Sequence, residues 1–166
     1  LQDALSTAPE PAAHAAASGG TDRSADRFSH LRLLVAEDNR TNQMVLKKML
    51  EPSGIRMTIC SNGQEAVDSF TAQRFDLVLM DMSMPVMDGL EATRRLRAWE
   101  HENGLRPCPI LALTANVLST DEAACRAAGM VGFLSKPVRK TQLLEQIAEW
   151  ADDKDFSPEV SPAKQA

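Results

Sequence analysis

Charged and hydroxyl residues stand at the ends of several apolar runs in this chain. Glu37 and Asp38 follow LRLLVA, Asp81 follows FDLVLM, Thr114 follows ILAL and Lys136 follows VGFLS. The carboxyl ends of parallel strands meet at one edge of a sheet, so we expect these side chains to lie together. Three carboxylates in one place repel each other, by about 4 kcal/mol per pair at 4 Å and an effective dielectric of 20. The cluster therefore needs cations, and a divalent metal and a lysine would supply them.

The donor types in this cluster suit Mg²⁺ and a phosphoryl group. Proteins usually hold Mg²⁺ through one or two carboxylates and leave room for water and phosphate. We predict that Asp38 and Asp81 are direct ligands and that Glu37 holds a water on the metal. The hydroxyl of Thr114 and the ammonium of Lys136 suit phosphoryl oxygens. Because neither GxxxxGK[ST] nor GxGxxG occurs, the predicted chemistry is phosphoryl transfer without a nucleotide-binding loop.

Short apolar runs alternate with segments of helical periodicity through the middle of the chain. The runs have the length of strands and cover residues 31–36, 55–60, 75–80, 110–113 and 131–134. Helical patterns follow Asn42, Asn62, Asp88, Ser119 and Thr141, and the first three of these are predicted caps or first-turn residues. Five strand–helix units in succession predict an α/β fold, a doubly wound parallel sheet with right-handed crossovers.

Composition predicts one domain with a tail at each end. The 166 residues suffice for a single ordinary core. Residues 1–29 are rich in Ala, Ser, Pro and Gly and are predicted to be a flexible linker, 30–151 the folded domain, and 152–166 a disordered tail. The chain begins with Leu1 and not with Met. We therefore expect it to be part of a longer protein.

Charge and hydropathy exclude several classes of function. A formal charge of -5 and a pI near 5.2 argue against a nucleic-acid-binding surface. No apolar run reaches the roughly 20 residues of a membrane span. Cys60, Cys108 and Cys125 are odd in number and lie in or beside apolar stretches, so we expect reduced, structural cysteines in a cytoplasmic protein.

Four segments resemble the receiver domain of two-component response regulators. They are VAEDNRTNQ, LVLMDMSMPVMDGLEATRRLR, ILALTAN and GFLSKPV, and they follow the order and spacing of that family across about residues 31–150. The resemblance is closest to receivers carried by hybrid histidine kinases. It implies a flavodoxin-like (βα)5 sheet with strand order 2-1-3-4-5. It also implies that the chain is the C-terminal part of a hybrid sensor kinase that is cytoplasmic or tethered to a membrane-bound kinase.

The resemblance assigns a role to each residue of the cluster. Asp81 would accept a phosphoryl group from the phosphohistidine of a histidine kinase or histidine phosphotransferase. Asp38, Asp81 and the backbone carbonyl of Met82 would bind Mg²⁺, with Glu37 beside them. Lys136 would contact the phosphoryl group and Thr114 would swing toward it. An Asp carboxylate is a known nucleophile, so an aspartyl phosphate is the expected product.

Further positions match the switch and the rate-setting residues of the family. Phe133 matches an aromatic residue that turns inward with Thr114, and the Lys136–Pro137 peptide matches one that is commonly cis. Ser83 and Asn116 match positions that tune dephosphorylation. Phosphorylation would then act on the face formed by residues 114–150, and a dimer through residues 119–150 is a further hypothesis.

Three other functions compete with this interpretation. A phosphohydrolase of the haloacid-dehalogenase kind also has an Asp nucleophile at a strand end, but it carries a second Asp two places on, where this chain has Ser83. A receiver that acts by binding alone would take up no phosphate. A stand-alone response regulator would act through protein contacts.

Overall fold

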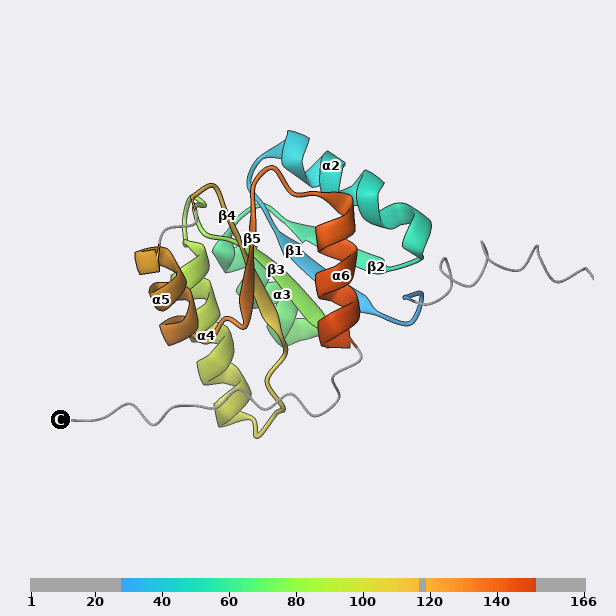
Figure 1. Cartoon of the computed structure of the whole chain (residues 1–166). Helices are drawn as coiled ribbons and strands as arrows, with labels where there is room; N and C mark the ends of the chain where they lie inside the picture. Colours follow the sequence, from blue (N-terminus) through green and yellow to red (C-terminus); the bar gives the residue numbers. More distant parts are fainter. Residues whose placement is uncertain (1–27, 117–118, 152–166) are drawn as a thin grey trace, which may run out of the picture.

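The computed structural model describes residues 28–116 and 119–151, although the side chains of 119 and 120 are not described. A parallel sheet of five strands runs through its centre (Figure 1). The strand order is β2-β1-β3-β4-β5, as predicted. The strands are β1 (Arg32–Ala36), β2 (Arg56–Cys60), β3 (Leu77–Asp81), β4 (Ile110–Thr114) and β5 (Gly132–Ser135). The helices are α2 (Arg40–Leu50), α3 (Gly63–Ala72), α4 (Gly89–Glu102), α5 (Ser119–Ala128) and α6 (Lys140–Ala151), with a short 3₁₀ turn, η2 (Glu51–Ser53).

Helices cover the sheet on both faces. Side chains alternate along each strand, so that Leu33 and Val35 of β1 join the core beneath α2 and α6, whereas Leu34 and Ala36 join the core beneath α3, α4 and α5. The central strands β3 and β4 are buried at every residue. Burial on both faces explains why these strands read as apolar runs and not as an alternating pattern.

Polar caps define where the helices begin. Asn62 and Asp88 are the N-caps of α3 and α4, and each side chain accepts a hydrogen bond from the backbone N–H of the third residue after it. Asn39 caps α2, and Asn42 lies in its first turn. The helix α5 ends at Ala128, and the next residue, Gly129, has a φ of 106°, a conformation that glycine adopts at little cost. All three predicted cap or first-turn residues are thus confirmed.

The strand boundaries differ slightly from the apolar runs. Leu31, Ile55, Phe75 and Val131 are buried or half-buried but precede the paired residues. The pattern reports burial, whereas a strand is defined by pairing, and this accounts for the shift. Phe28, assigned to the linker, packs in the core beneath α2 and α6. Ser29 is also described, whereas residues 1–27 of the predicted linker and the whole tail at 152–166 lie outside the described residues.

No described helix is both long and apolar enough to pass through a membrane.

All three cysteines are free and buried, as predicted. Burial is the main cause that raises the thiol pKa of Cys60, Cys108 and Cys125. Because the thiolate is the reactive form, we expect an aromatic disulfide reagent to label the native protein slowly and to label three thiols rapidly in guanidinium. Absorbance of the released thiol measures both rates. Rapid labelling of all three thiols without denaturant would contradict this packing.

Candidate functional site

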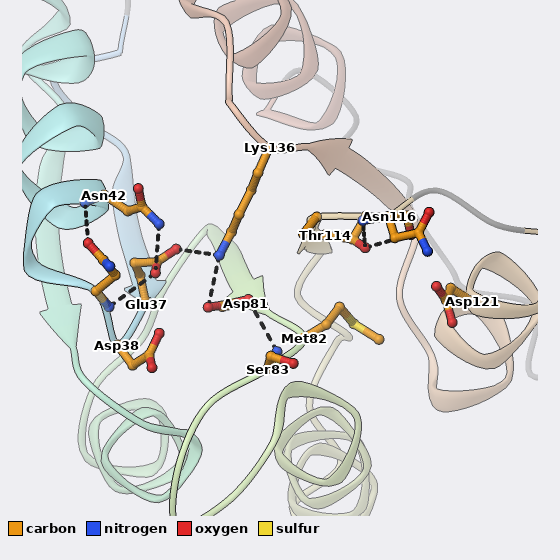
Figure 2. Close-up of a pocket in the computed structure, with 12 residues that line it drawn as sticks. Glu37, Asp38, Asn42, Asp81, Met82, Ser83, Thr114, Asn116, Asp121 and Lys136 are labelled. Atoms are coloured by element: carbon orange, nitrogen blue, oxygen red, sulfur yellow. Dashed lines mark hydrogen bonds and ion pairs between the residues drawn. The ribbon is translucent and has the colours of Figure 1, made fainter.

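A pocket opens at the carboxyl ends of β1, β3, β4 and β5 (Figure 2). It encloses about 510 Å³. The five residues singled out in the sequence all line it: Glu37, Asp38, Asp81, Thr114 and Lys136. The parallel topology brings them together, because each lies at or just after the end of its own strand.

Lys136 joins two buried carboxylates. Its Nζ lies 2.9 Å from Oε2 of Glu37 and 3.0 Å from Oδ2 of Asp81. Glu37 is 1% exposed and Asp81 is 3% exposed, so both charges would be costly without this cation. Burial raises the pKa of Asp81, and Lys136 and the Ser83 N–H oppose that rise. Burial lowers the pKa of Lys136, but its close contacts with the carboxylates of Glu37 and Asp81 outweigh that effect, so the pKa is raised and the amine stays charged.

The carboxylate of Glu37 is held on both sides. Its Oε1 accepts hydrogen bonds from the backbone N–H of Asn39, at 3.1 Å, and from Nδ2 of Asn42, at 3.2 Å. Its Oε2 has no hydrogen bond of regular angle among the described residues, so the Lys136 ion pair is what offsets the burial of this oxygen. Glu37 is therefore fixed in direction, which suits a residue that orients a water better than one that must move to bind a metal.

Three carboxylates converge where a cation would be held. One oxygen from each of Glu37, Asp38 and Asp81 lies within 4.8 Å of the others. Asp38 is exposed, whereas the other two are buried. An oxygen-only donor set with an open side matches the chemistry of Mg²⁺. The three carboxylates present therefore fit the predicted ion. Met82 also lines the pocket, and its backbone carbonyl accepts the N–H of Gly89.

The segment after Asp81 depends on a close backbone approach. The Gly89 N–H donates to the carbonyl of Met82 at 3.2 Å, which places the start of α4 against the pocket. A Cβ at Gly89 would overlap the carbonyl oxygen of Asp81. Glycine at this position therefore lets the start of α4 pack directly against the backbone of Asp81.

Thr114, Asn116 and Ser83 also line the pocket. The Thr114 hydroxyl donates to the carbonyl of Asn116 at 2.9 Å and accepts from its N–H at 3.1 Å. Figure 2 shows this pair apart from the Lys136 bridge. Ser83 contributes its backbone N–H, which donates to Oδ1 of Asp81 at 3.2 Å. Thr114 is thus bonded to its own loop and not to the charged cluster.

The remaining predicted positions lie on β5 and just beyond it. Phe133 is half-buried and packs against the core beneath α3, α4 and α5. The Lys136–Pro137 peptide is cis, as predicted. Phe133 pairs in register with Ala112, two residues before Thr114. The aromatic ring and the hydroxyl therefore belong to neighbouring strands.

Four residues of the pocket lining were not predicted from the sequence as site residues: Asn39, Asn42, Ala115 and Asp121. Asn42 was interpreted as a cap or first-turn residue, and its amide also orients Glu37. Asp121 was interpreted as a helix-start residue of α5, yet it lines the pocket. An acidic residue in the first turn of a helix is already favoured by the helix dipole. Nothing in the sequence therefore indicated that Asp121 would also line the pocket.

Comparison with known proteins identifies the family. The family model of the response regulator receiver domain matches residues 33–148 of this chain. The sensor histidine kinase GacS of Pseudomonas protegens is 36% identical over 119 residues, covering 72% of this chain and 13% of the relative. The sensory/regulatory protein RpfC of Xanthomonas campestris is 38% identical over 126 residues, covering 75% and 17%. The chain thus spans a small part of the curated relatives it matches.

Solved structures agree with this assignment. The receiver domain of a Pseudomonas aeruginosa sensor histidine kinase, with magnesium in its active-site cleft, is 41% identical, with a TM-score of 0.65 over 73% of this chain and 97% of that one. A Saccharomyces cerevisiae co-crystal structure holds a histidine phosphotransfer protein and the receiver domain of its downstream response regulator. It matches with 33% identity and a TM-score of 0.74 over 79% of this chain and 97% of that one. This protein, with its acidic pocket at the ends of a 2-1-3-4-5 sheet, belongs to the response regulator receiver domain family.

Proposed function

We propose that this domain accepts a phosphoryl group on Asp81 from a phosphohistidine, with Mg²⁺, as a step of a two-component phosphorelay. The observation that carries the proposal is the Lys136 ammonium, which lies 3.0 Å from Asp81 and 2.9 Å from Glu37 inside a pocket open to solvent. This arrangement keeps the acceptor carboxylate ready for reaction and leaves a cation beside the oxygens that would arrive.

The proposed reaction forms one bond and breaks one. A carboxylate oxygen of Asp81 attacks phosphorus, the P–N bond to the donor imidazole breaks, and the nitrogen leaves with the electron pair. Bound Mg²⁺ would neutralise charge on the transferred oxygens. Asp38, Asp81 and the Met82 carbonyl are the groups that would hold it, and Lys136 would stabilise the phosphoryl oxygens beside them. The product is an aspartyl phosphate.

The same pocket contains the groups proposed to respond to the new charge. The Thr114 hydroxyl exchanges its bonds with Asn116 for one to a phosphoryl oxygen, and Phe133 turns toward the space that Thr114 leaves. Ser83 and Asn116 line the pocket and are proposed to set the rate of dephosphorylation. The face of residues 114–150 would then carry the change to a partner.

Exposed apolar side chains on two segments that also contribute residues to this pocket suit a protein donor. The large hydrophobic side chains exposed among the described residues are Met44, Val45 and Val86. The first two lie on α2, which begins three residues after Glu37, and Val86 lies in the segment between Asp81 and α4. Val86 has a φ of 70°, rare for a β-branched residue, and strain of this kind gathers at functional sites. A donor with an apolar surface around its phosphohistidine would cover these three residues.

Transfer of label from a protein donor tests the proposed function. A purified histidine phosphotransferase is first labelled on its histidine and then mixed with this domain and Mg²⁺. We expect label to move to the wild-type domain and not to Asp81→Asn, in which the carboxylate nucleophile is gone. Label on Asp81→Asn as well as on the wild-type domain would mean that another residue is the acceptor. Uptake from acetyl phosphate without transfer from any phosphohistidine protein would overturn the donor assignment.

The exposed residues of α2 give a second prediction. We expect the double variant Met44→Ser, Val45→Thr to take label from the protein donor at least about tenfold more slowly, since each truncated interface anchor commonly costs 1 kcal/mol or more. Acetyl phosphate needs no protein interface, so its rate should be unchanged. Stopped-time labelling with both donors measures the difference. Equal loss with both donors would mean that the substitutions damage the pocket and not a docking surface.

We also propose a setting for the longer protein to which this domain belongs. This chain covers 13% of the length of GacS, a sensor histidine kinase, and 17% of the length of RpfC, a sensory/regulatory protein. We therefore propose that the longer protein is a hybrid histidine kinase with this domain at its C-terminal end. Three free, buried cysteines support a cytoplasmic location. The dimer predicted through residues 119–150 stays a prediction.

A further inference from the structure

A fourth carboxylate faces the pocket from α5. Asp121 lines it together with Glu37, Asp38 and Asp81, and within the part of the chain that the structure describes Lys136 is the one cation in the lining. Figure 2 shows Asp121 on the opposite side of the pocket from Glu37 and Asp38, beyond Met82. The lining therefore carries four carboxylates against one ammonium.

The charge of Asp121 is not offset by its neighbours. Lys136 is engaged with Glu37 and Asp81 at 2.9 and 3.0 Å. The adjacent acidic residue, Glu122, pairs with Arg126 of the next turn at 2.6 Å. Among the described residues, no ion pair or side-chain hydrogen bond involves Asp121. Its negative charge therefore acts on whatever enters the pocket.

The position of Asp121 also has an ordinary explanation, which the neighbouring residue can separate. Both Asp121 and Glu122 lie in the first turn of α5, where negative charge is favoured by the helix dipole. Only Asp121 lines the pocket. An effect of Asp121 that Glu122 does not share must therefore come from the pocket and not from the helix end.

We propose that Asp121 is a specificity-determining residue of the phosphoryl site, which weakens the hold on phosphoryl anions and strengthens the hold on Mg²⁺. The inference rests on the proposed phosphoacceptor function. A phosphoryl group adds about 1.5 to 2 negative charges at pH 7, and these would face Asp121 across the pocket. The same carboxylate attracts a divalent cation. One side chain thus acts with opposite sign on the two species that the site must hold together.

The size of the pocket sets the expected strength. A round space of 510 Å³ is about 10 Å across, close to the Debye length of about 10 Å at 0.1 M salt. The interaction is therefore felt at low salt and is largely screened at high salt. Unit charges at this separation change an equilibrium by about twofold at the dielectric of water and by about 15-fold at an effective dielectric of 20, before screening by salt. We expect effects of that size and not the complete losses that follow removal of an acceptor.

The experiment compares Asp121→Asn with Glu122→Gln in the same domain. The two substitutions each remove one first-turn charge from α5 and keep the side-chain shape. The first measurement is the initial rate of phosphorylation by acetyl phosphate with saturating Mg²⁺, at 0.05 M and at 0.5 M salt. The second is a calorimetric titration with MgCl₂ alone, which requires no phosphorylation. Thermal unfolding of each variant checks the fold.

We expect Asp121→Asn to be phosphorylated about three- to tenfold faster at low salt, with most of the gain lost at high salt. Its affinity for Mg²⁺ should fall by a similar factor. Glu122→Gln should match the wild type in both measurements. An equal change in both variants, no change in either, or slower uptake and weaker Mg²⁺ binding together would overturn the role of Asp121. If the wild type takes up no phosphoryl group, the proposed function fails, and the MgCl₂ titration still decides the charge effect.

Discussion

Replacing Lys136 with Met is expected to lower the rate of phosphoryl uptake by at least about 100-fold. Removal of one preorganised charged donor from a site of this kind commonly costs 10²–10³ in rate. The loss arises because Lys136 is the only cation that the described residues contribute to the pocket lining, and it contacts the proposed acceptor Asp81 at 3.0 Å. Rates with acetyl phosphate and saturating Mg²⁺ measure it. Lys140→Met, an exposed cation at the start of α6, is the matched control and should keep the wild-type rate.

The same variant has a predicted dependence on pH. Burial already raises the pKa of Asp81 and Lys136 opposes that rise, so removal of the ammonium raises the pKa further. A raised carboxyl pKa means that the folded state binds more protons than the unfolded state between the two pKa values, so stability falls as pH increases through that window. Lys136→Met should therefore lose more stability, relative to wild type, at pH 7 than at pH 4. Urea unfolding at both values measures this, and an equal loss at both would exclude uncompensated Asp81 as the cause.

Replacing Arg97 with Met is expected to cost about 3–5 kcal/mol of folding free energy, the range for breaking a buried ion pair on one side. Arg97 lies 2.7 Å from Glu100, and their side chains are 17% and 3% exposed. Arg97 also donates two hydrogen bonds to the carbonyl of Gly129, at 2.7 and 3.1 Å, and so ties α4 to the turn before β5. Glu100 Oε1 accepts from the N–H of Cys108. Without Arg97, a buried carboxylate remains without its cation.

A second arginine on the same helix provides the control for this prediction. Arg95 pairs with Glu91 at 3.0 Å, but their side chains are 53% and 44% exposed. Arg95→Met should therefore change stability by less than about 1 kcal/mol. Urea denaturation of both variants gives the comparison, and the double variant Arg97→Met, Glu100→Leu should recover part of the loss. Equal losses for Arg95→Met and Arg97→Met would show that burial does not decide the value of the pair.

The sequence was sufficient to predict the sheet because the fold concentrates burial in its strands. The runs ending at Met80 and Leu113 are apolar since β3 and β4 are covered on both faces. Asp81 and Thr114 interrupt that pattern at the edge of the sheet, so each was visible as an exception. The resemblance to the family then supplied the strand order, which alternation of strands and helices leaves open.

Contacts made by ordinary surface residue types were harder to predict. Asp121 is a residue type that is common at helix starts, and only the packing of α5 beside the residues that follow Asp81 brings it to the pocket. The Arg97–Glu100 pair reads as part of a polar helix face, although Glu100 is 2% exposed because the segment around Cys108 covers it. The bonds of Thr114 with Asn116 depend on a choice of rotamer that residue types do not determine.

The central proposal, acceptance of a phosphoryl group by Asp81, is tested most directly by intact mass. The domain is incubated with Mg²⁺ and acetyl phosphate beside Asp81→Asn and a sample in which the metal is chelated. We expect one added phosphoryl group in the wild type and none in the two controls. Addition to Asp81→Asn, or no addition to the wild type together with no release of inorganic phosphate, would contradict a phosphoacceptor at this position.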